Sequence, residues 1–254
     1  MARHVALEGT LNLRDLGGYA SGLGGAIRHG CLFRSDELHA LTDADLETVA
    51  ALGVRVVFDL RNDQERGLKP NRLWPDVELH ERETASHEPT NAGRTLADEI
   101  VSGWTGVPDD DEFAKVYIDL LTRLAPELRR IVTLAADADQ RPLLFHCAAG
   151  KDRTGIAAAV LLGLLGVDEA TILDDYELTT QFSTPKRLAE VAHLIEEHGA
   201  NLDHIRQFIS ARRPVLAKML DHLHATWGGF ERYATEVLGV EADLTARLRA
   251  ALLA

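Results

Sequence analysis

One ten-residue stretch decides the fold of this chain: residues 146–155, which read His146-Cys147-Ala148-Ala149-Gly150-Lys151-Asp152-Arg153-Thr154-Gly155. A short apolar run, residues 142–145, leads into this stretch, and a longer apolar segment, residues 156–165, follows it. The pattern predicts a buried strand, a tight loop and the beginning of a helix. Backbone N–H groups in such a loop and at the start of such a helix bind anions.

The predicted loop begins with a cysteine and ends with an arginine after five intervening residues. A thiolate at a helix N-terminus is an activated nucleophile, and a guanidinium can hold two phosphate oxygens at once. Small residues at Ala148, Ala149 and Gly150 let the backbone curl around an anion. We therefore expect Cys147 to attack phosphorus and form a phosphocysteine, while Arg153 and the loop amides bind the oxygens. The sequence thus predicts a phosphate-monoester hydrolase.

The loop also resembles the C-x-x-x-x-x-R signature of cysteine-dependent protein tyrosine phosphatases, with a His before it and a Thr after it. The resemblance extends to three other segments: residues 12–19 (NLRDLGGY), 32–38 (LFRSDEL) and 58–65 (FDLRNDQE). It continues weakly through Asp175-Tyr176 and Gly228-Gly229-Phe230. The chain is similar to the atypical bacterial branch, which has an HCxxGKDRTG loop. Members of that branch hydrolyse phosphotyrosine and often phosphoserine, phosphothreonine or phosphoinositides.

The resemblance implies supporting roles for three further loop residues. It makes His146 an orienting residue that hydrogen-bonds the backbone near Cys147, although an ordinary strand residue would give the same pattern. Thr154 is expected to hydrogen-bond the thiolate, to cap the helix, or both. Lys151 adds a second cation, and loops of the form Gly-Lys-x-Arg resemble those of phosphoinositide phosphatases. A solvated lysine is the alternative interpretation.

An acid must protonate the departing oxygen, because an alkoxide or a phenolate leaves poorly. Asp59 ends an apolar, β-branched run, and parallel strands would bring this end to the same sheet edge as Cys147. Asp152 lies inside the loop itself. We assign the proton donor to Asp59 and a role in shaping the loop to Asp152. The reverse assignment stays open, and so does a structural pair between Asp59 and Arg61 or Arg14.

The rest of the sequence predicts an α/β fold. Five elements set the pattern: a helix that opens at Thr42, a strand over residues 54–60, two helices within residues 113–136 that meet at Pro126, and a strand over residues 143–146. This alternation predicts a mostly parallel central sheet flanked by helices. Apolar residues at helical spacing predict that the C-terminal third is helical. We expect one helix to start at Ser183-Thr184-Pro185.

We interpret residues 1–254 as a single phosphatase domain, because no linker-like tract interrupts them. Some members of the resembled family cover their site with a mobile helical lid. Residues 183–213 are the candidate here, with a turn at Gly199-Ala200-Asn201, and fixed packing helices are the alternative. Two cysteines, no evident signal peptide and no apolar run of membrane-spanning length predict a cytoplasmic protein without integral membrane association.

The formal net charge is −13, with 40 acidic residues against 27 Lys and Arg, which argues against a nucleic-acid partner. No clustered His and Asp residues have metal-ligand spacing, so we expect no metal and no cofactor. The expected partners are a phosphorylated protein or a phosphoinositide as substrate, and inorganic phosphate as product. Local donors such as Arg153 and Lys151 must attract them, because the overall field is repulsive.

Two alternatives belong to other functional classes. A phospho-ligand-binding scaffold on the same fold would ordinarily have lost the cysteine or the arginine, and both are present here. A rhodanese-like sulfurtransferase also places a cysteine in an anion-binding loop after a strand. The ending Lys-Asp-Arg-Thr-Gly, residues 151–155, fits that class poorly.

Overall fold

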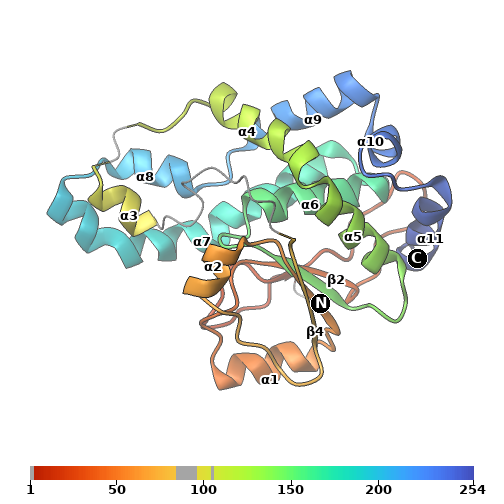
Figure 1. The fold of residues 1–254 in the computed structure, drawn as a ribbon, viewed down its shortest axis with the longest axis horizontal. Coiled ribbons are helices and arrows are strands. Elements are labelled where there is room, and N and C mark those ends of the chain that lie inside the picture. Colours follow the sequence, from red (N-terminus) through yellow and green to blue (C-terminus); the bar gives the residue numbers. More distant parts are fainter. Residues whose placement is uncertain (1–2, 84–95, 104–105) are drawn as a thin grey trace.

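A five-stranded sheet lies at the centre of the computed structural model, which describes residues 3–83, 96–103 and 106–254 (Figure 1). The strands are β1 (Arg14–Asp15), β2 (Leu32–Ser35), β3 (Val56–Asp59), β4 (Glu78–Glu81) and β5 (Leu143–His146), in the spatial order β1-β2-β5-β3-β4. All neighbouring pairs are parallel except β1 with β2. The predicted mostly parallel sheet is therefore confirmed.

The register of the parallel strands brings three polar residues to one edge of the sheet. His146 at the end of β5 lies opposite Ser35 of β2 on one side and Asp59 of β3 on the other. All four residues of β5 are buried, because this strand is central and helices cover both faces. The chain leaves β5 at this edge and enters the loop that begins with Cys147.

The helices are α1 (Asp43–Ala51), α2 (Asp63–Leu68), α3 (Leu96–Val101), α4 (Asp110–Arg123), α5 (Ala125–Ala136), α6 (Asp152–Leu164), α7 (Glu169–His198), α8 (Leu202–Ile209), α9 (Arg213–Trp227), α10 (Phe230–Glu236) and α11 (Ala242–Leu252). Figure 1 shows α1 on one side of the sheet and α4, α5 and α6 on the other. The sheet side chains divide accordingly. Phe33, Val57 and Leu144 pack in the cluster of α1, whereas Phe58 and Phe145 pack in the larger helical cluster.

Local sequence signals explain where several helices begin. Thr42 caps α1 in a capping box with Asp45, and this confirms the helix predicted to open at Thr42. The helices α4 and α5 meet at Leu124, with Pro126 in the first turn of α5. Proline fits a first turn because no intrahelical hydrogen bond needs its missing N–H. The predicted junction at Pro126 is therefore confirmed.

The helix start predicted at Ser183-Thr184-Pro185 is wrong. These residues lie inside α7, which runs without interruption for 30 residues. A proline removes only one backbone donor, and packing on both sides of it holds the helix together. Tyr176 packs in the main core, and Val191 packs in a small cluster with residues of α3 and α8. The turn predicted after α7 is confirmed, since Gly199 ends the helix in the left-handed conformation.

The C-terminal third is helical, as predicted: α7 and α10 pack on α6, α9 packs mainly on α4, and α11 packs mainly on α5. Ten of the thirteen residues of α6 are buried, so this helix is the centre of the larger helical layer. The C-terminal half of α7 extends with α3 and α8 beyond the sheet (Figure 1). In the described part of the chain, no helix combines the length and the apolar character that crossing a membrane requires.

Candidate active site

The predicted strand, loop and helix are confirmed around Cys147. The strand β5 ends at His146, and α6 begins at Asp152. Lys151 is the N-cap of α6 and provides no side-chain cap. The N–H groups of the first turn therefore have no capping acceptor from this residue, as expected where a bound anion takes that place.

Two of the loop carbonyls are held by hydrogen-bond donors that lie outside the loop. The carbonyl of Gly150 accepts hydrogen bonds from Arg34 Nη2 at 2.8 Å and from Asn12 Nδ2 at 3.1 Å. The carbonyl of Ala148 accepts from the backbone N–H of Glu37 at 3.2 Å. Because a trans peptide points its N–H opposite to its C=O, these contacts direct the following N–H groups toward the other side of the loop.

Glycine is required at position 150 for two reasons. Its φ of +63° lies in the left-handed region, which other residues rarely adopt. An added Cβ would also lie 2.6 Å from the carbonyl oxygen of Ser35 and 2.7 Å from the side-chain nitrogen of Asn12. The loop therefore packs directly on the edge of the sheet at this point.

A buried ionic network supports the loop from below. Asp175 of α7 accepts hydrogen bonds from Arg14 Nε at 3.0 Å, Arg34 Nη1 at 2.6 Å and the Tyr19 hydroxyl at 3.0 Å. Burial alone would raise the pKa of Asp175, but the charges of Arg14 and Arg34 hold it well below its usual range. The carboxylate is thus ionised, and Arg34 connects it to the Gly150 carbonyl. Two guanidinium groups against one carboxylate leave a net positive charge beneath the loop.

Arg153 is held in a fixed orientation by Glu65 of α2. Its Nη1 and Nη2 atoms donate to Glu65 Oε2 and Oε1, each at 2.6 Å, and Nη1 also donates to the Leu60 carbonyl at 3.2 Å. Glu65 is itself positioned by the capping box of α2, in which Asn62 N–H donates to Oε2 at 2.9 Å. Burial alone would raise the pKa of Glu65, but the hydrogen bonds and charge of Arg153 lower it.

This arrangement leaves one edge of the Arg153 guanidinium available. A guanidinium has five N–H groups, and the contacts with Glu65 and Leu60 use three of them. The remaining two, on Nε and Nη2, lie side by side. No other residue in the described chain takes a hydrogen bond from them. Such a pair matches two oxygens of a phosphate group.

Cys147 and its neighbours His146 and Thr154 are buried. Cys147 is 1% exposed, and His146 Nδ1 lies 3.2 Å from the Cys147 carbonyl oxygen, to which it donates. Burial lowers the pKa of His146, although the charge of Asp59 partly opposes this shift. The Thr154 hydroxyl is buried with no hydrogen-bond partner among the described residues, so Thr154 does not cap α6 through its side chain.

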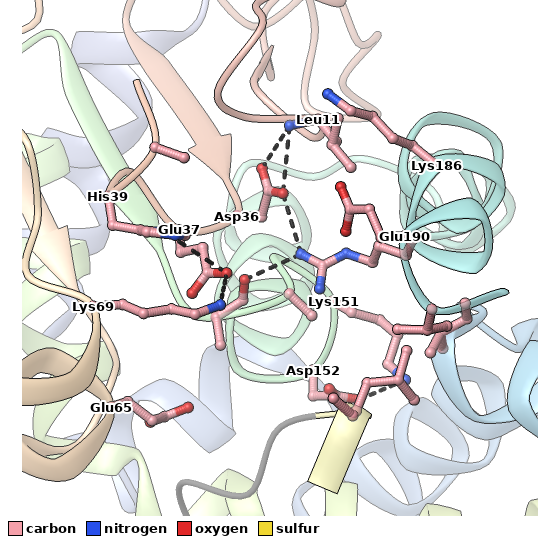
Figure 2. Close-up of a pocket in the computed structure, with 18 of the residues that line it drawn as sticks. Leu11, Asp36, Glu37, His39, Glu65, Lys69, Lys151, Asp152, Lys186 and Glu190 are labelled. Atoms are coloured by element: carbon pink, nitrogen blue, oxygen red, sulfur yellow. Dashed lines mark hydrogen bonds and ion pairs between the residues drawn. The ribbon is translucent and has the colours of Figure 1, made fainter. Parts of the chain in front are cut away.

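A cavity of about 520 Å³ opens beside the loop, and Figure 2 shows the residues that line it. Ala148, Ala149, Lys151 and Asp152 form the loop side, whereas Cys147 and Arg153 lie behind them and do not line it. Residues of α7 and α8 form the opposite wall, among them Lys186, Arg187, Glu190, Val191, Phe208 and Ile209. The walls combine apolar side chains with charged groups of both signs.

Lys151 is not the solvated lysine that the sequence left open. It is 4% exposed, and its Nζ donates to the Phe208 carbonyl at 2.6 Å. The same nitrogen lies 5.3 Å from the ring centre of Phe113 and 5.4 Å from that of Phe208. A cation at these distances is attracted to the ring faces. Lys151 therefore links the loop to the end of α8.

Asp59 lies at the predicted sheet edge, but its contacts are those of a buried structural ion pair. It is fully buried and accepts hydrogen bonds from Arg61 Nη2 and Asn71 Nδ2, both at 2.8 Å. Burial alone would raise the pKa of Asp59, but His146 and Arg61 lower it to about 2. The structure thus shows the pair with Arg61, while Arg14 pairs with Asp175 instead. Asp59 does not line the cavity.

Of the two candidate aspartates, Asp152 is the one that lines the cavity. Its side chain is 35% exposed, and its Oδ1 accepts a hydrogen bond from the Tyr117 hydroxyl at 2.5 Å. Lys151 Nζ lies 3.5 Å from the same oxygen. Within the described residues, no group of three or more His, Cys, Asp or Glu side chains is placed to hold a metal ion.

Several residues of the site were not identified from the sequence. Glu65 had a readable signal, because Asn62-x-x-Glu65 is a capping-box pattern that fixes the glutamate at a helix start. Arg34 and Asp175 lie in segments that carry the family resemblance, but their pairing across 141 residues has no local signal. Tyr117 lies in an ordinary amphipathic helix, and nothing in the sequence connects it with Asp152.

The substitution Glu65→Gln tests the orientation of Arg153. Glutamine keeps the size of the side chain but removes the charge-assisted hydrogen bonds, so we expect phosphate affinity to fall roughly tenfold or more. Isothermal titration with inorganic phosphate measures the effect. Glu37→Gln is the matched control, because Glu37 also lines the cavity but pairs with Lys69 at 2.7 Å. Equal affinities in both variants would contradict the role assigned to Glu65.

Comparison with known proteins agrees with this geometry. Residues 5–254 match the model of the tyrosine phosphatase family. The chain is 34% identical over 212 residues to the triple specificity protein phosphatase PtpB of Mycobacterium tuberculosis, covering 75% of this chain and 74% of that protein. It is 30% identical over 224 residues to a tyrosine-protein phosphatase of Nostoc commune, covering 84% and 71%. The resemblance seen in the sequence is confirmed: the chain belongs to the tyrosine phosphatase family and is a phosphatase.

Proposed function

We propose that this phosphatase hydrolyses phosphotyrosine through a phosphocysteine intermediate on Cys147. The observation that carries the proposal is the guanidinium of Arg153, which Glu65 holds so that two adjacent N–H groups stay available beside the cysteine loop. Phosphotyrosine is further supported by the names of the relatives, one of which is a tyrosine-protein phosphatase and another a triple specificity protein phosphatase.

The first half-reaction transfers the phosphoryl group to the enzyme. The loop amides and Arg153 hold the non-bridging oxygens, and the Cys147 thiolate attacks phosphorus opposite the leaving oxygen. The S–P bond forms as the P–O bond to the substrate breaks. A carboxylic acid gives its proton to the departing oxygen, which leaves as a neutral alcohol or phenol.

The second half-reaction returns the enzyme to its starting state. The carboxylate formed in the first half takes a proton from a water molecule, whose oxygen attacks phosphorus. The S–P bond breaks, Cys147 leaves as a thiolate, and inorganic phosphate is released. The buried hydroxyl of Thr154 has no other partner in the described chain and is suited to stabilise the leaving sulfur.

We now assign the proton donor to Asp152 instead of Asp59. A general acid must reach the leaving oxygen, and of the two candidate aspartates, Asp59 and Asp152, Asp152 is the one that lines the cavity. Asp59 is fully buried and pairs with Arg61. Burial alone would raise its pKa, but its neighbours His146 and Arg61 lower it to about 2 and so stabilise the carboxylate form, which opposes a role as proton donor. Its place at the sheet edge agrees with the sequence prediction, but its environment favours the structural role.

The cavity wall favours an aromatic substrate over a multiply phosphorylated lipid headgroup. Phe113 and Phe208 present aromatic surface near the loop, which suits the ring of phosphotyrosine. Lys151, the second cation of the loop, is already bound to the Phe208 carbonyl. The wall cations Lys186 and Arg187 contact the Glu8 carbonyl and Asp36. Phosphoserine, phosphothreonine and phosphoinositides are therefore secondary substrate classes. The two free cysteines, Cys31 and Cys147, support the cytoplasm as the compartment.

The substitution Cys147→Ser tests the proposed function directly. It should abolish hydrolysis of phosphotyrosine peptides and of p-nitrophenyl phosphate, because a serine hydroxyl is a far poorer nucleophile here than a thiolate. Binding of inorganic phosphate should remain, since the loop amides and Arg153 are unchanged. Full turnover by the variant, or loss of wild-type activity on metal chelation, would contradict the mechanism. Phosphate binding without turnover by the wild type would identify a scaffold.

Leaving-group dependence identifies the acid. p-Nitrophenolate leaves without much help from a proton, whereas a serine alkoxide needs one. We expect Asp152→Asn to lower kcat on a phosphoserine peptide by roughly 10²-fold or more, and much less on p-nitrophenyl phosphate. Asp59→Asn should change both rates by the same factor, because it disturbs the buried pair with Arg61. The reverse pattern would return the acid to Asp59.

We also propose that residues 183–213 act as a lid over the cavity. The C-terminal half of α7 forms one wall of the cavity together with α8. Among the described residues, side-chain hydrogen bonds from Lys151 to the Phe208 carbonyl and from Arg187 to the Ala148 carbonyl connect this wall to the loop. The Arg187 Nη2 atom lies 3.2 Å from Asp36 Oδ2, and Lys151 reaches the Phe208 carbonyl. A substrate would have to displace these contacts or pass beside them.

Hydrogen exchange tests the lid. Amide groups of residues 183–213 should exchange faster than those of α6, and they should become more protected when phosphate or orthovanadate binds. The buried helix α6 serves as the internal reference for a rigid element. Slow exchange in residues 183–213, unchanged by either anion, would show that these helices are fixed packing elements.

A further inference from the structure

Two buried tyrosines form a hydrogen-bonded chain that ends on Asp152. Tyr117 of α4 is fully buried, and its hydroxyl lies 2.5 Å from Asp152 Oδ1. Tyr176 of α7 is 1% exposed, and its hydroxyl lies 2.6 Å from that of Tyr117. The two rings meet edge to face at an angle of 87°. Side chains from α4 and α7 thus meet at a carboxyl group at the start of α6.

The direction of these hydrogen bonds follows from the single proton that each tyrosine hydroxyl carries. A carboxylate can only accept, so the Tyr117 hydroxyl uses its single proton to donate to Asp152. Tyr176 must then donate to the oxygen of Tyr117. Burial raises the pKa of both tyrosines, and the charge of Asp152 raises it further. Both side chains therefore remain phenols and donors throughout the working pH range.

This chain distinguishes the two oxygens of Asp152. Its Oδ1 receives the Tyr117 hydroxyl and lies 3.5 Å from Lys151 Nζ. Its Oδ2 has no hydrogen-bond partner in the described chain, and the carboxyl group lines the cavity. A proton on Asp152 is therefore carried by Oδ2, the oxygen that is free to meet a substrate. The buried phenol determines which way the acid faces.

We propose that Tyr117, itself held by Tyr176, is a positioning residue that orients Asp152 for proton transfer. The inference rests on the proposed function, because it takes Asp152 as the acid. In the first half-reaction, Oδ2 gives its proton to the leaving oxygen, and the hydrogen bond from Tyr117 stabilises the carboxylate that remains. In the second, the same carboxylate takes a proton from water at Oδ2.

The packing around the tyrosines makes the chain a fixed support. An added Cβ on Gly155 of α6 would lie 3.0 Å from the ring of Tyr176, so the ring packs directly on the backbone that follows the loop. Asp152 is the first residue of the same helix. The helix α6 thus carries the carboxyl group and also contacts the ring of Tyr176. These contacts hold the Tyr117 hydroxyl at hydrogen-bond distance from Asp152.

The substitution Tyr117→Phe tests the proposal because it keeps the ring and removes only the hydroxyl. We expect kcat on a phosphoserine peptide to fall about tenfold, the effect of losing a hydrogen bond to a charged group, with a much smaller change on p-nitrophenyl phosphate. Tyr176→Phe should show the same selectivity with a smaller loss. In the Asp152→Asn background, Tyr117→Phe should add no further leaving-group dependence.

Tyr233→Phe is the matched control. Tyr233 of α10 is also fully buried, and its hydroxyl donates to the Leu121 carbonyl of α4 at 2.5 Å, without contacting Asp152. Its loss should leave the ratio of the two rates unchanged. Thermal unfolding of each variant confirms that the rates refer to folded protein.

Two results would overturn the inference. If Asp152→Asn is selective for the poor leaving group but Tyr117→Phe lowers both rates equally, Tyr117 is only a packing residue and the proposed function survives. If Asp152→Asn itself shows no selectivity in an active enzyme, the assignment of the acid is wrong, and the inference fails with it. Absence of any wild-type turnover would instead contradict the proposed function itself.

Discussion

The hydrogen bonds that hold the loop carbonyls are the constraint on which the rest of the site depends. A phosphate dianion would be repelled by a carbonyl oxygen that faces it, so hydrogen-bond donors outside the loop are needed to hold the loop carbonyls. Arg34 and Asn12 donate hydrogen bonds to the Gly150 carbonyl, and the backbone N–H of Glu37 donates one to the Ala148 carbonyl. In the proposed mechanism, the N–H groups on the opposite side serve as a preorganised anion site, which costs no rearrangement when charge develops.

The helix α7 contributes residues both to the hydrogen bonds that hold the loop and to the other parts of the site. Its N-terminal half supplies Asp175, which holds Arg34 beneath the loop, and Tyr176, which supports Tyr117. Its C-terminal half supplies Arg187, which reaches the carbonyl of Ala148 from the cavity side at 3.3 Å. One uninterrupted helix therefore contacts the loop from two directions. The continuity of α7 through Pro185 is what makes this possible.

The parts of the site that sequence could predict are those with local signals. The strand, the loop and the helix around Cys147 are encoded in consecutive residues, and the spacing of Cys147 and Arg153 carries the chemistry. The predicted start of a helix at Pro185 failed because packing outweighed the local preference of proline. Asp59 was placed at the correct edge, but its environment depends on Arg61 and on Asn71, twelve residues away.

The remaining residues act through contacts that no local pattern describes. Arg34 and Asp175 are separated by 141 positions, and Tyr117 and Asp152 by 35. Such pairs become visible only when the fold is known. Glu65 is intermediate, since its capping box is readable in the sequence while its contact with Arg153, 88 residues later, is not.

The most direct test of a preformed phosphate site is a crystal structure of the Cys147→Ser variant with inorganic phosphate. The phosphate oxygens should accept hydrogen bonds from the loop amides and from Nε and Nη2 of Arg153. Arg153 should still pair with Glu65, and the carbonyl of Gly150 should remain on Arg34, as in the structure described above. Phosphate bound elsewhere in the cavity, or a loop whose peptides must turn over to bind it, would contradict this account.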